Sequence, residues 1–224
     1  MAILHRTTLT PTKLELLAGW LPDRPWFSGS IDALEQVGSY RFDDPDDAVG
    51  IETLLLTAGD DTVVQVPLTY RGAPAEALEP ALVGTLEHGV LGTRWVYDGT
   101  ADPIYVRAVV DCVLLATGEA SRFVDGEEEM RLLENDTRVR GSGIHLDRLN
   151  DSASIGQAEG TTTRIETGIG VIDVFRQLGL DAAAPDDAGI LVGTWEGQTA
   201  PMLLAALQLN ASAIRHALQI ARQP

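Results

Sequence analysis

The sequence predicts an α+β fold with two small antiparallel sheets and one buried helix. Most apolar segments are short, alternate with polar residues and end at Gly, Pro or Asp, which is typical of antiparallel strands. One longer segment, 104–118, carries apolar residues over more than half of a helical circumference, which favours a largely buried helix. The 224 residues are enough for one large domain or two small ones.

The N-terminal segment is expected to begin with helical turns and to continue into strands. Residues 12–21 (TKLELLAGWL) favour one or two helical turns that end at Pro22. Residues 39–44 (SYRFDD) alternate as a strand and lead into an acidic turn at 43–47.

Two hairpins follow. Residues 50–58 and 62–72 are rich in strand-forming residues and are joined by Gly59, Asp60 and Asp61, which is a hairpin signature. Residues 81–99 predict a second pair of strands, with glycines at turns or bulges.

A helix is predicted after the second hairpin. Asp102 suits the N-cap, because its carboxylate accepts from free N–H groups, and Pro103 suits the first helical position. Gly118 is predicted to end this helix.

The remaining segments predict a polar connector, a second sheet and a last helix. Residues 119–160 are polar and weakly periodic, which fits either a mobile connector or an irregular layer with short strands. The last helix is expected in 210–224, with Asn210 or Ser212 near its cap. Strands of a second antiparallel sheet, with a short loop at 180–189, are predicted at 161–168, 170–178, 189–195 and 199–209.

The composition narrows the classes of partner. Sixteen Lys and Arg against 33 Asp and Glu give a formal charge of −17, which repels nucleic acid and anionic lipid. The N-terminus lacks the pattern of a signal peptide, and no apolar stretch is long enough to span a bilayer. Cys112 is the only cysteine, so no internal disulfide or cysteine metal cluster can form. A soluble cytoplasmic protein without a nucleic-acid or membrane partner is expected.

Three separated motifs resemble the N-terminal cap domain of actinobacterial maltokinases. They are MAILHRTTLTPTKLELLAGWLPDRPWF (1–27), VPLTYRGAP (66–74) and LEHGVLGTRWVYDGTADP (86–103), in the family's order. The resemblance implies a curved antiparallel sheet against a helix, similar to a cystatin fold. In that family the cap precedes a kinase body that phosphorylates maltose from ATP, often beside trehalose synthase. We therefore expect a cap-like domain at 1–104.

The resemblance extends into residues 105–224, where it implies the buried helix, the polar connector and a small β-rich half like a kinase N-lobe. Maltokinases carry the ATP-binding lysine in a run like L-K-V-F-R-R-L, and the matching stretch here is 172–178. Asp173 then stands where the lysine is expected, and an acidic side chain there repels phosphates. The sequence ends before a kinase C-lobe, so we expect no phosphotransfer, no enzyme activity and no cofactor.

The stretch 86–99 is the densest candidate site. As a sugar or partner surface, Trp95 and Tyr97 would offer aromatic faces, and Arg94 and Asp98 would hydrogen-bond hydroxyl groups close to His88. The alternative, which we favour, is a structural hairpin in which Trp95 and Tyr97 share one strand face and Arg94 and Asp98 share the other.

A second cluster of residues could supply a base and a nucleophile for catalysis. We favour the alternative that these side chains make hydrogen bonds that fix the first strand and a turn. The members of the cluster are His5, Thr7, Thr8, Tyr70 and Arg71.

The histidines at 5, 88, 145 and 216 lack metal-site spacing, and the acidic runs 43–47 and 127–129 lack a calcium-loop pattern, so no metal site is expected.

A third cluster contains Trp20, Pro22, Pro25 and Trp26. It either packs on the sheet or forms an exposed patch for a protein partner.

These observations lead to two hypotheses about the function. The first is a non-catalytic interaction or regulatory module that binds a protein, with trehalose synthase or a sugar kinase as candidates, or associates with itself. The second is a sugar- or nucleotide-binding protein, or an enzyme, that uses the His88–Asp98 region. The predicted binding residues are Trp20, Trp26, Tyr70, Arg71, His88, Arg94, Trp95 and Asp98.

Overall fold

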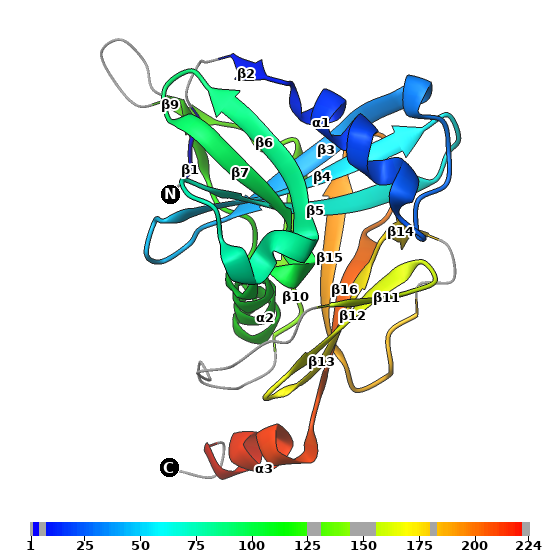
Figure 1. Ribbon diagram of the computed structural model, residues 1–224. Helices are drawn as coiled ribbons and strands as arrows, with labels where there is room; N and C mark the ends of the chain where they lie inside the picture. The colour runs from blue at the N-terminus through cyan, green and yellow to red at the C-terminus, as the bar shows by residue number, and fades with distance from the viewer. Residues whose placement is uncertain (1, 5–7, 125–130, 144–155, 180–182, 221–224) are drawn as a thin grey trace.

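A computed structural model describes residues 2–4, 8–124, 131–143, 156–179 and 183–220. The fold is rich in β structure, with a curled antiparallel sheet, a second antiparallel sheet beside it and few helices (Figure 1). A small third sheet joins β1 (Ala2–Leu4), β8 (Arg122–Val124) and β9 (Arg131–Leu133), with β1 parallel to β8.

The first sheet contains both predicted hairpins. Its order is β2-β6-β7-β5-β4-β3, and β14 also pairs with β5. Asp60 Oδ1 accepts from Thr62 N at 2.9 Å in the turn of the first hairpin, so a local side chain supports that turn. The strands are β2 (Leu9–Thr10), β3 (Leu34–Phe42), β4 (Val49–Ala58), β5 (Val63–Arg71), β6 (Leu82–His88), β7 (Gly92–Asp98) and β14 (Gln177–Leu178).

The first helix covers one face of this sheet. α1 (Lys13–Trp20) begins at Thr12, which exchanges hydrogen bonds with Glu15 in a capping box. Pro22 lies inside a following 3₁₀ turn, η1 (Leu21–Asp23), so the helical path continues slightly beyond the predicted end. A bulge at Gly84, with φ of +154°, leaves room for α1, because a Cβ there would lie 2.7 Å from Leu16 Cδ1.

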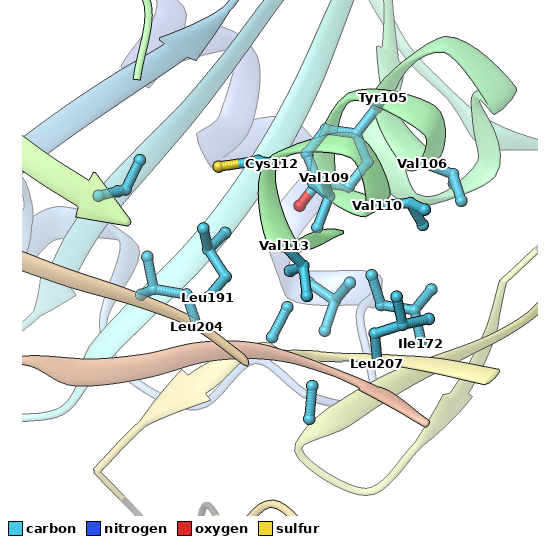
Figure 2. Packing of buried hydrophobic residues seen from close by; sticks show 14 of the residues in the cluster. Tyr105, Val106, Val109, Val110, Cys112, Val113, Ile172, Leu191, Leu204 and Leu207 are labelled. Carbon is cyan, nitrogen blue, oxygen red and sulfur yellow. The ribbon is translucent and has the colours of Figure 1, made fainter. Parts of the chain in front are cut away.

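The second helix, α2 (Pro103–Leu115), packs between the two sheets (Figure 2). Asp102 caps it, as predicted, by accepting from Ile104 N at 3.0 Å. The predicted end at Gly118 is wrong: the helix ends at Leu115, and Ala116 takes the left-handed conformation with φ of 54°. Gly118 instead forms a β-bridge with Arg140.

The second sheet has the order β10-β15-β16-β13-β12-β11, with every pair antiparallel. Two of its strands come from the polar connector, so the described parts of 119–160 include short strands. The last helix, α3 (Ala211–Ile220), is capped by Asn210. The strands are β10 (Thr137–Gly141), β11 (Gln157–Glu159), β12 (Thr162–Thr167), β13 (Gly170–Phe175), β15 (Gly189–Trp195) and β16 (Met202–Leu209).

The two sheets share one apolar core. Ile51 and Leu55 from β4 pack in the same cluster as Val109 of α2 and Ile172 of β13, and Leu54 and Leu56 belong to the cluster under α1. The run Leu54–Leu56 is continuously apolar because both faces of β4 are covered.

A buried glutamine joins the sheets through polar contacts. Gln65 of β5 is fully buried, and its Nε2 donates to the carbonyls of Phe175 at 2.9 Å and Leu204 at 3.0 Å. Its Oε1 accepts from Tyr40 Oη at 2.9 Å. The amide therefore satisfies polar groups of both sheets inside the core.

Candidate functional site

The candidate site lies where the chain passes from the second sheet to the first. β13 ends at Phe175 and β14 begins at Gln177, so Arg176 lies at the corner between them. Its N–H donates to Thr161 O at 2.8 Å, and its carbonyl accepts from Gln65 N at 2.8 Å. These bonds hold the backbone of Arg176 to both sheets.

The side chain of Arg176 is only 1% exposed and forms an ion pair with Asp98. Nη2 donates to Asp98 Oδ1 and Oδ2 at 2.9 and 2.6 Å and to Thr100 Oγ1 at 2.6 Å. Nε donates to Thr163 Oγ1 at 2.7 Å. A buried guanidinium requires such partners, because an unpaired buried charge is strongly unfavourable.

Asp98 is placed by the end of β7. It caps the short 3₁₀ helix η4 (Gly99–Ala101), since its Oδ1 accepts from Thr100 N at 3.0 Å and from Thr100 Oγ1 at 2.8 Å. The same carboxylate therefore fixes a turn of the first sheet and balances the charge of the arginine at the corner between the sheets.

Tryptophans form one wall of the site. The guanidinium carbon of Arg176 lies 4.6 Å from the ring centroid of Trp26, and that of Arg24 lies 4.8 Å from the ring centroid of Trp20. The two indoles meet edge to face at 5.8 Å. Trp20 and Trp26 are 8% and 3% exposed, so the structure corrects the exposed-patch alternative: both side chains belong to the core.

A pocket of about 170 Å³ opens beside these groups. It is lined by Arg24, Trp26, Asp98 and Arg176 together with residues of the 3₁₀ helix η3 (Glu76–Ala81). Two buried nitrogens of its lining residues, Arg24 Nε and Arg176 Nη1, find no hydrogen-bond partner in the part of the chain that the structure describes. Trp20, Trp26 and Asp98 are the predicted binding residues that meet here.

Tyr70 lies elsewhere, in a network around the buried Glu52 of β4. Its Oη donates to Glu52 Oε2 at 2.9 Å, and Lys13 Nζ donates to the same oxygen at 2.5 Å. Burial raises the pKa of Glu52, but the charges of Lys13 and Arg41 and these hydrogen bonds outweigh it and lower the pKa to about 2. Burial and the neighbouring Glu52 raise the pKa of Tyr70 well above its usual value, so the phenol stays protonated.

Arg71 forms a separate pair with the cap of α2. Its Nε and Nη2 donate to the two oxygens of Asp102 at 2.9 and 2.8 Å, and Thr69 Oγ1 donates to Asp102 Oδ2 at 2.8 Å. Tyr70 and Arg71 thus engage different carboxylates. Thr8 lies beside the β6–β7 turn, where its carbonyl accepts from Gly89 N, while His5 and Thr7 lie outside the described residues.

The remaining predicted residues lie along the β6–β7 hairpin. His88 Nδ1 accepts from the N–H groups of Val90 and Leu91 at 3.3 and 3.1 Å, and Arg94 Nη2 donates to Leu91 O at 2.8 Å. Trp95 is half-buried on β7. His88 lies at the tip and Asp98 at the base of the hairpin, so the two do not form one site.

Side chains of β7 alternate between its two faces as predicted, but at the base of the hairpin both faces are buried rather than one. Val96 is fully buried in the cluster under α1, and Tyr97, on the opposite face, is 2% exposed. Tyr97 Oη accepts from Ala75 N at 2.8 Å, because the segment before η3 covers this side of the sheet.

Among the described residues, no group of three or more His, Cys, Asp or Glu side chains is placed to hold a metal ion. His145 and the acidic run 127–129 lie outside them. Similarly, no described helix is long and apolar enough to cross a membrane.

Sequence reasoning missed the central residue of the site. Arg176 stands in the run VFRQL, where the sequence predicts a strand of the second sheet and the resemblance implies the run with the ATP-binding lysine, but neither points to Arg176. A lone arginine between residues that are expected to be buried is a usable signal, because such a cation needs a buried carboxylate.

Comparison with known proteins identifies the segment that supplies most of this site. Residues 20–102 match the family model of the maltokinase N-terminal cap domain. It extends from the last residue of α1 to the cap of α2 and contains β3 to β7. All eight predicted binding residues lie within it, whereas Arg176 lies outside. No curated protein matches the chain.

Proposed function

We propose that this chain is a non-catalytic interaction or regulatory module, related to the maltokinase cap, that binds an enzyme of maltose, trehalose or α-glucan metabolism. Trehalose synthase and a sugar kinase are the candidate partners, and self-association is the alternative assembly. The observation that carries the proposal is the cap-family match at 20–102. The second sheet, which follows this segment, holds Asp173 at the position where the resemblance expects the ATP-binding lysine.

The surroundings of Asp173 support a role without phosphotransfer. Asp173 accepts from Arg164 Nε and Nη2 at 2.8 and 2.9 Å across β12 and β13. β13 pairs in turn with β16 of the same sheet. The side chain at this position is thus a carboxylate engaged by Arg164, whereas phosphotransfer requires a lysine that contacts the nucleotide phosphates.

The tip of the β6–β7 hairpin is the partner surface that we propose. Val90 and Leu91 are 59% and 47% exposed at this tip. His88 and Arg94 hold the turn through the hydrogen bonds described above, so their role would be to present the apolar pair. An ordered apolar tip suits insertion into a partner's groove, because little conformational entropy is lost on binding.

Binding of the purified 224-residue chain to trehalose synthase and to a maltokinase, measured by biolayer interferometry, tests this proposal. The double variant Val90→Ser/Leu91→Ser should weaken the complex at least tenfold. Leu132→Ser, at a 61% exposed position on β9, is the matched control and should leave it unchanged. Sedimentation of the chain alone tests self-association with the same variants.

Activity assays complete the test. The chain should neither bind Mg-ATP nor transfer phosphate from ATP to maltose. Phosphate transfer would overturn the non-catalytic role, and equal partner affinity in the tip variant and the control would overturn the proposed surface. Absence of both complexes and of self-association would overturn the interaction role itself.

A further inference from the structure

We propose that the pocket beside Arg176 binds a small oxyanion, either phosphate or a short-chain carboxylate. The pocket lies at the base of the β6–β7 hairpin and the tip at its other end, so this site is independent of the partner surface proposed above.

The first argument is the unused donors of Arg176. A guanidinium carries five N–H groups. Nε and Nη2 are engaged by Thr163, Asp98 and Thr100, while the two N–H groups of Nη1 have no acceptor among the described residues. Leaving buried donors without acceptors is unfavourable, so an acceptor oxygen in the pocket would be stabilised there.

The second argument is charge. Arg24 lines the same pocket, is held over Trp20, and has an Nε that likewise lacks an acceptor within the described part of the chain. Arg24 and Arg176 carry two positive charges, and Asp98 is the lining carboxylate, which leaves one net positive charge at the pocket. This positive charge, within a chain whose formal charge is −17, favours binding of a monoanion in the pocket.

The third argument is size. Ligand pockets for drug-sized molecules measure roughly 300–1,000 Å³. The 170 Å³ pocket is therefore too small for a nucleotide or a disaccharide, although it is far larger than the ~10–15 Å³ that one water needs. Phosphate and short carboxylates fit this volume.

The walls suit such an ion. Thr163 lines the pocket, and its Oγ1 accepts from Arg176 Nε, so its hydroxyl group can still donate one hydrogen bond to an anion. Trp26, Pro25 and Pro80 supply apolar surface, which lowers the local dielectric constant and strengthens the attraction between the guanidinium groups and an anion.

Thermal unfolding of the full chain, titrated separately with inorganic phosphate, acetate and glycerol at constant ionic strength, tests the site. Phosphate or acetate should raise the Tm saturably, and whichever anion does so identifies the source of the oxyanion. Glycerol serves as the neutral ligand of similar size and should give no saturable rise.

Two variants connect the binding to the pocket. Arg24→Gln removes one of the two lining cations, and Ala77→Leu adds bulk at an exposed lining position without changing charge, so each should weaken anion affinity at least tenfold. Arg107→Gln, at a 55% exposed arginine of α2, makes the same charge change outside this pocket and should stay within twofold.

Three results would overturn the proposal. They are the absence of a saturable rise with both anions, equal losses in Arg24→Gln and Arg107→Gln, and glycerol binding that Ala77→Leu abolishes. If Arg24→Gln fails to fold, the comparison of Ala77→Leu with Arg107→Gln decides the question.

Discussion

Arg176, at the corner between β13 and β14, forms an ion pair with Asp98 of β7, in which Nη2 lies 2.9 and 2.6 Å from the two carboxylate oxygens and the arginine is 1% exposed. The pair joins the matched cap segment to the strand that crosses from the second sheet. Because this contact lies in the core, it couples the two parts of the chain more strongly than a surface ion pair would.

Replacing Arg176 with Met should destabilise the protein by about 3–5 kcal/mol, because Asp98 is left without its cation in a mostly buried place. The double variant Arg176→Met/Asp98→Asn should lose less than the sum of the two single variants. Urea unfolding at pH 7 measures both. Arg164→Met, which breaks the more exposed pair with Asp173, is the control and should cost about 1 kcal/mol or less. Strict additivity of the double variant would contradict the coupling.

Gln65→Leu should destabilise the protein by about 2–4 kcal/mol, because Tyr40 Oη loses its acceptor and two buried carbonyls lose their donor. Chemical denaturation measures the loss. Gln36→Leu, at an exposed position of β3 whose amide donates to Ser39 Oγ, is the matched control. Similar stabilities of the two variants would show that the amide contributes little to joining the sheets.

Trp26→Ala should lower the free energy of unfolding by about 3–5 kcal/mol, because the substitution leaves a cavity in the cluster under α1. It also removes the cation–π contact with Arg176, which is worth roughly 0.5–2 kcal/mol within that loss. A fall in Tm measures the effect, with Val90→Ser at the exposed tip as the comparison. An unchanged Tm for Trp26→Ala would return this residue to the candidates for a partner surface.

The parts of the fold that sequence reasoning predicted depend on local signals. Strand alternation and the Gly59–Asp61 turn specify the β4–β5 hairpin, and Asp102-Pro103 specifies the start of α2, since all the interacting groups are neighbours in the chain. The end of α2 depends on a longer-range fit: β10 lies so close that a Cβ at Gly141 would lie 1.9 Å from Cys112 O.

Arg176 shows why most of the candidate site could not be predicted. Its partners Asp98, Thr100 and Thr163 are 78, 76 and 13 residues away in the sequence, so no spacing pattern brings them together. Conversely, residues that are neighbours in the sequence do not meet in one site: Tyr70 and Arg71 are adjacent in β5 but engage Glu52 and Asp102 respectively. Adjacent positions on a strand point to opposite faces, so a sequence cluster there does not become one site.

Glu52 should make stability depend on pH in the acid range. Its pKa in the folded protein is about 2, below the ordinary value of 4.5, so the unfolded chain takes up a proton first as the pH falls. The stabilisation, about 3 kcal/mol at most, is therefore complete above pH 4.5 and is lost as the pH falls from 4.5 toward 2. The difference in unfolding free energy between the wild type and Glu52→Gln should shrink over this interval. Tyr70→Phe, which removes one donor to the carboxylate, should raise the folded pKa of Glu52 and move the loss to higher pH. A difference that stays constant from pH 6 to pH 2 would contradict the assignment of this carboxylate as the low-pKa partner of Lys13 and Arg41.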